Sequence, residues 1–589
     1  MCDIEIPMGS IVGLNYSGMH DSSVAIVSPT GKVLYASSLE RFSRKKQDGQ
    51  FPTLLLDSVD WDKVSKVAIS NSKSYAMPKN GVSLFHPVPL QKDILADRSH
   101  KKQYYDHIDT IDKEKLFFPH HKCHASSSFY GSGFENALCL VYDGGMANEH
   151  WFGGVYEASV ANGIKTIDLF STQSYSNITH LYSYITALLG FTPLKHEGKI
   201  TGLAAYGNVT RELKELLNSW LCDPRKLKCL FWWEYMYEEN PSVKIDKETL
   251  AKVQKEFSKF SKEDLAATVQ ELAEEHILKI LENIKKANIQ QDNICLSGGL
   301  FANVKINQRV SEAGFKNIFV APPMSDDGTA LGAAWLAVHS LNHKIEKKPF
   351  DTMYLGKANT LQSFLKTNHN LIYKKYDDVS KFIATKLSEG FICALFQGKS
   401  EFGPRALGNR SILAQATQYG INDSLNKRLN RTEFMPFAPV IRDIDMDKYF
   451  FIKEGEKLTS KFMTITLNCT KQAKKECPAV VHVDNTARPQ RVEKKDNSLV
   501  YDILTKYAEL TNKYALVNTS FNIHEEPIVN SYADAIKGFF ESGLDYLYMD
   551  GIVVSLKDNY KLQKYYTKKK IKKKNSFIRV VENFIKKVH

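Results

Sequence analysis

The stretch SIVGLNYSGMHDSSVAIVSPTGKVLYASSLE, residues 10–40, contains three short runs with the composition of β-strands, at 10–16, 22–28 and 33–39. A Pro-Thr-Gly turn separates the last two runs, and this pattern predicts a β-hairpin. A glycine-containing turn separates the first two runs, and such a turn lets backbone N–H groups approach an anion closely. The stretch therefore predicts a hairpin unit with one turn facing a binding cleft.

A second stretch repeats this arrangement. In ALCLVYDGGMANEHWFGGVYEASV, residues 137–160, a buried strand ends at Asp143, two glycines follow, and another strand returns near 152–158. Two related hairpins predict an actin-like α/β fold (the ASKHA architecture), in which duplicated ribonuclease-H-like lobes flank a cleft. We expect this N-terminal domain to span residues 1–350.

Two further glycine-rich turns follow a long helix predicted at 262–286. The first, in ICLSGGLFANVKIN, offers Gly298, Gly299 and Asn303 as ligand contacts. In the second, VAPPMSDDGTALGAAWLA, Gly328 opens an Ala-rich helix, and its N-terminus suits a phosphate or a metal-bound ligand. We expect the four turns to converge on one cleft.

The length of the chain indicates more than one domain. At about 150 residues per domain, 589 residues correspond to three or four folding units. A polar, loosely patterned segment at 351–380 predicts a linker. Beyond it, strand signals and arginines beside Gly and Pro predict a second α/β domain over 381–558, followed by a basic tail over 559–589.

Positive charge is concentrated in that tail. It carries eleven Lys or Arg and one Glu, so the rest of the chain, with 67 basic and 65 acidic residues, is nearly neutral although the net charge is +12. A lysine run, KKKIKKK at 568–574, precedes apolar residues at helical spacing. Three alternatives stay open: a small helix docked on the body, attachment to nucleic acid, and attachment to an anionic membrane.

No apolar run approaches the roughly 18 residues of a membrane span, and the N-terminal sequence MCDIEIPMGS lacks the features of a signal peptide. We therefore expect a cytoplasmic protein without a transmembrane segment. The nine cysteines are scattered and include no Cys-x-x-Cys pair. This pattern argues against both a disulfide framework and a zinc ribbon.

The segment FFPHHKCHAS is the leading candidate for metal binding. His120 and His124 are four residues apart, which places both on one face of a helix, and Asp143 would meet them across the cleft. The second carboxylate would come from SDDG, where we expect Asp327 and keep Asp326 as the alternative. Two imidazoles and two carboxylates suit iron(II), manganese or zinc with open positions for an anionic ligand. A cluster of hydrogen-bonded histidines without a metal is the structural alternative.

Ten motifs occur in order: GLNYSGMHDSS, ERFSRKKQDGQFP, HHKCHASSSFY, VYDGG, HEGKITGLAAYG, LSGGLFANVKIN, GPRALGNRSIL, PFAPVI, HVDNTARPQ and NTSFN. With these motifs the sequence resembles, from about residue 10 to 555, the O-carbamoyltransferase family of nodulation-factor and antibiotic biosynthesis. The resemblance implies an N-terminal actin-like domain that binds a divalent metal, with Fe2+ expected. It also implies a C-terminal domain similar to the threonylcarbamoyl-adenylate synthase fold. That domain would make carbamoyl adenylate from carbamoyl phosphate and ATP, with Mg2+ on the ATP, and the N-terminal domain would transfer the carbamoyl group to a hydroxyl.

The resemblance also assigns roles in the C-terminal domain. Arginine forks bind phosphate oxygens in pairs and stabilise the charge that develops on a leaving pyrophosphate, while Asn and Ser donors suit a carbamoyl group or a ribose. The implied set is Arg405, His482 and Arg488 in catalysis, with Arg410, Arg431, Asp484, Asn518, Ser520 and Asn522 in substrate binding. A surface ion pair is the alternative for any single arginine.

In the N-terminal domain, His20 and Asp21 are candidates to accept the proton of the attacking hydroxyl. An Asx-turn is the structural alternative for Asp21. The remaining candidates, each expected to line the cleft or its mouth, are Arg41, Lys45, Glu197 and Lys199. A salt bridge at the start of a helix is the alternative for the last two.

Two segments depart from the family pattern. The family commonly has an adjacent Arg-Glu pair and an arginine just before Pro-Phe-Ala-Pro, whereas this chain reads RTEFM from Arg431 onward. A segment that often reads Gly-Glu-aromatic-Lys is HEGK at 196–199 here. Both segments face the substrates, so the departures concern nucleotide and acceptor binding more than the reaction class.

The acceptor is the part of the function that the sequence leaves open. We expect a small hydroxylated metabolite such as a sugar or an antibiotic. The basic tail keeps a hydroxymethylated DNA base as an alternative, and a non-catalytic nucleic-acid-binding protein that retains the fold is an alternative of another class. A binder would need neither the metal set nor the arginine set, which favours the enzyme. A homodimer also stays open.

Overall fold

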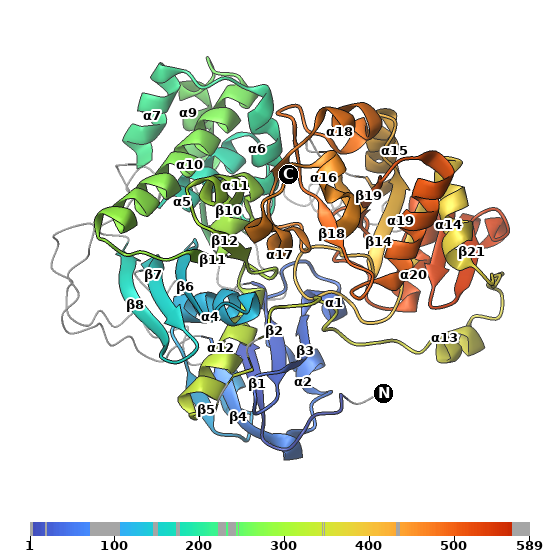
Figure 1. Ribbon diagram of the computed structural model, residues 1–589, viewed down its shortest axis with the longest axis horizontal. Coiled ribbons are helices and arrows are strands. Elements are labelled where there is room, and N and C mark those ends of the chain that lie inside the picture. The colour runs from blue at the N-terminus through green and yellow to red at the C-terminus, as the bar shows by residue number, and fades with distance from the viewer. Residues whose placement is uncertain are drawn as a thin grey trace, which may run out of the picture.

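Three large mixed sheets organise the protein, as the ribbon in Figure 1 shows. The computed structural model describes residues 4–17, 20–70, 106–144, 151–171, 177–221, 231–233, 243–245, 247–343, 345–346, 348–430 and 436–567. Among these residues, no helix combines the length and the apolar character that a membrane span needs.

The first two sheets repeat one topology. One has the order β3-β2-β1-β4-β5 and the other β8-β7-β6-β11-β12. In each, three antiparallel strands form a meander, and two parallel strands continue the sheet beyond the first strand. The bounds are β1 Ser10–Asn15, β2 Ser23–Val27, β3 Val33–Ser38, β4 Val64–Ile69, β5 Lys115–Phe117, β6 Asn136–Tyr142, β7 Trp151–Ser159, β8 Gly163–Ser171, β11 Asn293–Ser297 and β12 Asn317–Val320. The repeat confirms the predicted actin-like duplication, and both predicted hairpins are present.

Each of these two sheets forms the centre of one lobe: the first lobe contains β1–β5, and the second contains β6–β8, β11 and β12. Two helices cross between the two lobes. Helix α4 (His120–Ser132) packs on the second sheet, and α12 (Asp327–Ser340) packs on the first. Glycines permit the close contacts: a Cβ at Gly332 would lie 1.9 Å from the carbonyl oxygen of Cys123 on α4, and one at Gly13 would lie 1.9 Å from that of Ala330. The N-termini of α4 and α12 consequently lie close to the end of β6.

Helices cover the outer face of the second sheet. They are α5 Ile178–Leu188, α6 Glu197–Leu203, α7 Arg211–Leu221, α9 Lys247–Glu256, α10 Lys262–Lys286 and α11 Val304–Glu312. Helix α10 has the predicted bounds, because the Ser261 side chain accepts a hydrogen bond from the N–H of Asp264 at its start. Its buried stripe packs against α5, α6 and α7.

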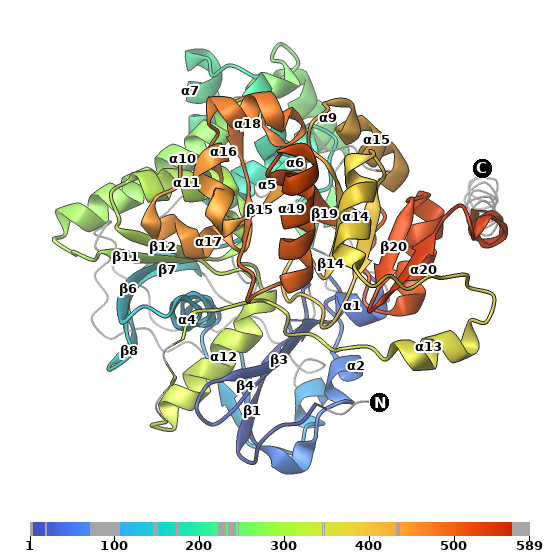
Figure 2. The same ribbon diagram turned by 45° about the vertical axis from the view of Figure 1, so that its right-hand side comes forward.

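The third sheet has seven strands in the order β18-β15-β19-β14-β13-β20-β21. Its strands are β13 Cys393–Phe396, β14 Arg410–Gln415, β15 Ala438–Arg442, β18 Gln490–Val492, β19 Ala515–Ser520, β20 Tyr546–Met549 and β21 Ile552–Ser555. Helices α14 (Val379–Ser388) and α19 (Ser498–Thr511) pack together on one face, as Figure 2 shows. The predicted second α/β region is therefore present.

Shorter elements complete the fold. They are α1 Glu40–Ser43, α2 Thr53–Leu56, β9 Phe231–Trp233, β10 Val243–Ile245, α13 Leu361–Thr367, α15 Gly420–Leu429, α16 Met446–Tyr449, α17 Lys457–Ser460, β16 Leu467–Asn468, α18 Lys471–Glu476, β17 Thr486–Ala487 and α20 Tyr532–Ser542.

Two predicted connecting segments are packed against the body. Within the predicted linker, the carbonyl of Leu355 accepts a hydrogen bond from the N–H of Ala36. At the start of the predicted tail, the Asn559 amide exchanges hydrogen bonds with the backbone of Ile372, and the Tyr566 ring stacks on Phe540 at 5.4 Å. The lysine run at 568–574 and the apolar residues after it lie outside the described residues.

Candidate functional site

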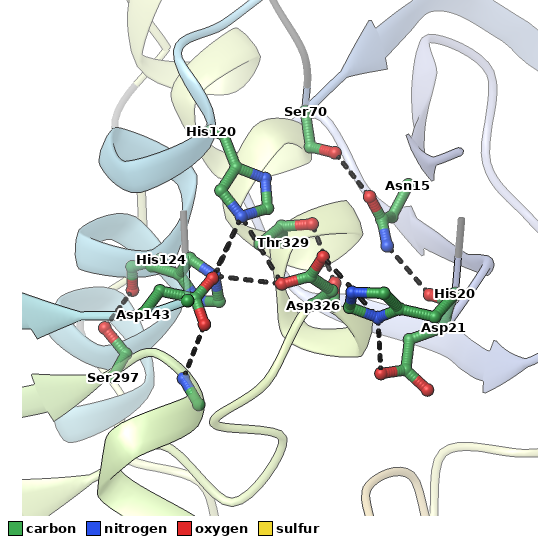
Figure 3. A network of polar contacts seen from close by, with 12 residues as sticks. Asn15, His20, Asp21, Ser70, His120, His124, Asp143, Ser297, Asp326 and Thr329 are labelled. Atoms are coloured by element: carbon green, nitrogen blue, oxygen red, sulfur yellow. Dashed lines mark hydrogen bonds and ion pairs between the residues drawn. The ribbon is translucent and has the colours of Figure 1, made fainter. Parts of the chain in front are cut away.

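Four side chains converge where α4 and α12 begin and β6 ends (Figure 3). His120 and His124 lie one turn apart on α4, with their Nε2 atoms 3.2 Å from each other. His120 Nε2 is 3.4 Å from Asp143 Oδ2 and 3.3 Å from Asp326 Oδ1. His124 Nε2 is 3.5 Å and 3.4 Å from the same two oxygens. Both imidazoles are completely buried.

These separations fit a bound divalent cation. Ligand atoms held at 2.0–2.2 Å around a tetrahedral ion lie roughly 3.3–3.6 Å apart. A cation would accept lone pairs from both imidazoles and both carboxylates at once. Hydrogen bonds among the four groups cannot satisfy all of them in the same way, because an Nε2 atom carries either a proton or a lone pair. Two nitrogen and two oxygen donors suit a first-row metal.

The carboxylates in this cluster are held in their ionised form. Burial alone would raise the pKa of Asp143, but contacts with His120 and His124 hold it well below its ordinary value. Burial would likewise raise the pKa of Asp326, but the two histidines outweigh burial and lower that pKa. In turn, burial lowers the pKa of His124, and the two carboxylates outweigh it and raise that pKa. The site thus favours positive charge at its centre.

The preference for Asp327 as the second carboxylate is wrong, and the structure places the alternative, Asp326, in the cluster. Asp326 immediately precedes α12 and Asp327 is its first residue. Successive side chains at a helix start diverge by about 100°, so only one of the two can face the histidines. The backbone carbonyl of Asp327 accepts a hydrogen bond from Ser23 Oγ at 2.8 Å. Burial, Asp21 and Glu40 raise the pKa of the Asp327 carboxyl.

The glycine pair after β11 positions a ligand carboxylate. The N–H of Gly299 donates to Asp143 Oδ1 at 3.1 Å. Gly298 has φ +99°, and a Cβ there would lie 2.3 Å from the carbonyl oxygen of Tyr142. Gly299 therefore supports Asp143, and the predicted contact of the two glycines with a substrate stays a prediction.

His20 lies beside the cluster, in the turn between β1 and β2. Its Nδ1 is 3.0 Å from Asp21 Oδ2 and 3.9 Å from Asp326 Oδ2. The turn is fixed because Asn15 donates to the Asp21 carbonyl at 2.7 Å and Ser70 donates to Asn15 (Figure 3). Burial lowers the pKa of His20, but the neighbouring carboxylates outweigh it and raise the pKa to about 9. This charge state suits a hydrogen-bond donor better than the predicted proton acceptor.

A second group of polar residues gathers at one end of the strands of the seven-stranded sheet, which we call the sheet edge. Strand β14 starts where its antiparallel neighbour β19 ends, β15 starts beside the same end, and β18 runs parallel to β15. The segments before β14, β15 and β18 and after β19 therefore share this sheet edge. These segments carry the predicted Arg405, His482, Asp484, Arg488 and Asn522, and the last residues of β19 add Asn518 and Ser520, whereas Arg431 lies outside the described residues.

Three amide and hydroxyl side chains fix the end of β19. Asn518 donates from Nδ2 to the Ala406 carbonyl at 3.1 Å and to Gln490 Oε1 at 2.6 Å. Its buried Oδ1 has no hydrogen-bond partner among the described residues. Ser520 donates to Asn522 Oδ1 at 2.6 Å. Asn518 thus joins two segments of the edge and retains an acceptor for a ligand.

The loop before β14 is built around Glu401, a residue that the sequence analysis did not single out. Its Oε1 accepts the N–H groups of Leu407, Asn409 and Arg410 at 2.9–3.0 Å, and the side chain is buried. Arg405 projects from this loop and is half-buried. A buried glutamate shortly before a Gly-Pro-Arg turn is the signal that could have indicated this role.

Arg410 is not available to a phosphate, contrary to prediction. The guanidinium is completely buried, stacks on Phe396 at 3.7 Å and donates to the carbonyls of Gln397, Gly398 and Asn409 at 2.6–3.0 Å. It closes the turn after β13. Its role is therefore structural.

We expect Glu401→Ala to lower the free energy of unfolding by about 3 kcal/mol or more, because three buried N–H groups lose their acceptor. Urea titration of the full chain would measure the loss. Glu389→Ala is the matched control: Glu389 pairs with Lys386 at the surface, where an ion pair contributes about 0–1 kcal/mol. Equal midpoints for the two variants would contradict the organising role of Glu401.

Several predicted cleft residues have structural partners. Asn303 is the N-cap of α11, where its Oδ1 accepts from Lys305 and Ile306 N–H groups, so the predicted ligand contact is not supported. Glu197 accepts from Ser183 Oγ at 2.7 Å and from the Leu194 N–H. Burial raises the pKa of its carboxyl. Lys199 is buried 5.4 Å from the Phe191 ring, and Lys45 is exposed.

Two arginines of the first lobe donate hydrogen bonds to segments of the sheet edge. Arg41, predicted at the cleft mouth, is buried and donates to the carbonyl of Gly403 at 2.7 Å. Arg44, which sequence reasoning missed, donates to the carbonyls of Pro527 and Ile528 at 2.7 Å each. A cluster of basic residues directly after a short helix gives no indication of these distant partners.

The second lobe also contacts this edge. His196 Nε2 lies 2.9 Å from Glu525 Oε1, beside His524. Its Nδ1 accepts the N–H of Thr192 at 3.1 Å, which leaves the proton on Nε2. The imidazole is therefore a donor to Glu525 and a poor metal ligand, although the three side chains are close together.

Comparison with protein families matches residues 87–335 to the carbamoyltransferase N-terminus and residues 384–556 to the carbamoyltransferase C-terminus. An uncharacterized protein of Methanocaldococcus jannaschii is 30% identical over 560 residues, 91% of this chain and 98% of that protein. The nodulation protein NolO of Bradyrhizobium diazoefficiens is 30% identical over 452 residues, 74% of this chain and 78% of that protein.

Solved structures are more distant. Full-length HypF in its phosphate- and nucleotide-bound form is 14% identical with a TM-score of 0.30, covering 58% of this chain and 56% of that one, a similarity too low to support an inference. The two family matches include the four residues of the metal cluster and the whole seven-stranded sheet. The chain therefore belongs to the carbamoyltransferase family, and it is an enzyme of the carbamoyltransferase class.

Proposed function

We propose that this carbamoyltransferase acts on a hydroxyl group and uses two reaction centres. At the edge of the seven-stranded sheet, water would hydrolyse carbamoyl phosphate to carbamate and inorganic phosphate, and a carbamate oxygen would then attack the α-phosphorus of ATP, forming carbamoyl adenylate and releasing pyrophosphate. The carbamoyl group of the adenylate would then pass to the acceptor hydroxyl at the metal cluster, with AMP as the leaving group and release of the hydroxyl proton. The observation that carries the proposal is that this member of the family has both a four-ligand cation cluster and an arginine-bearing sheet edge, which Arg41 of the first lobe contacts.

At the sheet edge, the chain supplies fixed donors for polyanionic substrates. Arg405 and Arg488 are half-buried cations on segments that meet there. Preorganised cations stabilise charge that develops on a leaving pyrophosphate without having to reorient. Glu401 keeps the Arg405 loop in place, and Asn518 links that loop to the segment before β18. These residues would bind and orient ATP, with Mg2+, and the carbamoyl donor.

At the metal cluster, His120, His124, Asp143 and Asp326 would hold a divalent cation, for which we propose Fe2+. When bound, such a cation polarises a carbonyl as a Lewis acid. His20 would donate a hydrogen bond to the adenylate, since it lies beside Asp326 and next to Asp21, whose carbonyl accepts from Asn15. We propose a small hydroxylated metabolite as the acceptor.

Incubation of the full-length enzyme with carbamoyl phosphate, Mg-ATP and Fe2+ tests this function. We expect pyrophosphate release and, with a suitable sugar or antibiotic, the mass gain of one carbamoyl group in the acceptor. The control omits carbamoyl phosphate. Absence of pyrophosphate release with every acceptor, and without any, would refute the proposal.

We expect a truncation after residue 567 to leave turnover on a free small acceptor within about twofold, since every candidate catalytic and binding residue precedes residue 558. Residues 559–567 stay because they pack on the body, whereas the deleted segment carries nine Lys or Arg and one Glu. Steady-state kinetics would measure the turnover. If the acceptor is DNA, the truncation should instead weaken binding and flatten its salt dependence, by about 0.9 in log-log slope per lost phosphate contact.

A further inference from the structure

A lysine of the second lobe reaches into the edge of the seven-stranded sheet. Lys305 belongs to α11, two residues after the N-cap Asn303. Its Nζ lies 2.8 Å from Asp484 Oδ2, in the segment before β18. The side chains of Lys305 and Asp484 are 22% and 25% exposed, so the pair is largely shielded from water. A charge pair of this kind holds its partners more firmly than an exposed one.

Asp484 distributes its two oxygens between different partners. Oδ2 faces Lys305, whereas Oδ1 accepts the N–H and the hydroxyl of Thr486 at 3.0 Å and 2.7 Å and lies 3.3 Å from His482 Nδ1. Burial alone would raise the pKa of this carboxyl, but His482 and Lys305 lower it. The carboxylate is therefore ionised and held from both sides, which also fixes the orientation of the His482 ring.

The opposite nitrogen of His482 has no partner. Its Nε2 is buried and makes no hydrogen bond with any residue that the structure describes, and the residue is only 6% exposed. The ring of Tyr206, from the second lobe, stands edge-on to the imidazole at 5.8 Å. Buried polar atoms without a partner are rare in folded proteins, and a bound ligand is one of the few explanations for them. The segment with His482 also carries Arg488 and reaches the sheet edge assigned to the carbamoyl donor and ATP.

We propose that Lys305 is a positioning residue for carbamoyl-adenylate formation. It fixes Asp484, Asp484 fixes His482, and Nε2 of His482 contacts the carbamoyl- or phosphate-bearing substrate. This inference rests on the proposed function and adds that the adenylate-forming centre is not built by the C-terminal part alone: the second lobe of the actin-like fold completes it.

Full-length Lys305→Met tests the proposal through pyrophosphate release with carbamoyl phosphate and Mg-ATP. We expect kcat to fall roughly 10- to 100-fold, the loss typical of a misplaced group, while KM for ATP changes little. Lys305→Arg keeps the charge and should recover most of the rate. Asp484→Asn should lose as much as Lys305→Met, and the double variant should lose little more, because both residues act through His482.

Ser311→Ala is the matched control. Ser311 lies on the same helix and donates to Glu456 Oε1 at 2.5 Å, a contact between the same two parts of the protein that does not involve His482. It should lower the melting temperature without lowering kcat. Wild-type kcat in both Lys305→Met and Asp484→Asn would overturn the positioning role alone. A wild-type enzyme that releases no pyrophosphate would overturn the proposed function and this inference with it.

Discussion

Arg405→Ala or Arg488→Ala should reduce ATP-dependent pyrophosphate release by about 10²-fold or more, because the substrate phosphates lose a fixed cation where charge develops. His124→Ala and His20→Ala should leave pyrophosphate release measurable while ending transfer to the acceptor. His124 belongs to the metal cluster and His20 lies beside it, and neither comes from the segments that form the sheet edge. Preformed carbamoyl adenylate should restore transfer in the arginine variants and not in the histidine variants. Pyrophosphate assays and mass spectrometry of the acceptor would measure the two half-reactions separately.

Arg428→Ala is the control for the arginine variants. Arg428 donates to the carbonyl of Gly543 beside Asp545, which lies at the opposite edge of the seven-stranded sheet. It should retain pyrophosphate release. Loss of pyrophosphate release in folded His124→Ala, as judged by circular dichroism, would show that one composite site performs both steps.

The second large effect concerns metal content. Purified protein should contain about one equivalent of a first-row divalent metal, and His124→Ala should lose nearly all of it, because a four-ligand site loses a buried imidazole. Elemental analysis after gel filtration would measure the content. Full retention of metal by His124→Ala would refute the site.

The adjacent aspartates provide an internal control for this prediction. Asp326→Asn should lose the metal, since Asp326 Oδ1 lies within 3.4 Å of both imidazoles. Asp327→Asn makes the same chemical change one residue later and should retain it, because the Asp327 carboxyl is not part of the cluster. The opposite result would restore the ligand expected from the sequence.

The sequence predicted the elements that local pattern controls. The two hairpins and helix α10 have the expected positions because alternation and helical periodicity are properties of consecutive residues. The spacing of His120 and His124 was likewise sufficient to place both on one face of a helix. Asp143 at the end of its strand was also placed correctly beside them.

Roles that depend on distant segments were harder to predict. Glycines 298 and 299 were expected to face a substrate, but one of them supports Asp143, because β11 pairs with β6 and brings the turn against that carboxylate. Arg410 was expected to bind phosphate, but the β13–β14 pairing buries it among carbonyls of its own turn. Sequence gives the residue type in both cases and not its partner.

The duplicated actin-like lobes, the second α/β region after them, and the histidines and arginines suited to carbamoyl transfer could all be predicted from the amino-acid sequence. The packing of the chain was needed to show that Asp326 rather than Asp327 joins the histidines, that Glu401 organises the Arg405 loop, and that Lys305 reaches Asp484. Helical and strand periodicity depend on neighbours in the chain, so a sequence pattern reveals them. The direction in which a side chain finds its partner depends instead on how α4, α12 and the seven-stranded sheet pack, which no local pattern encodes.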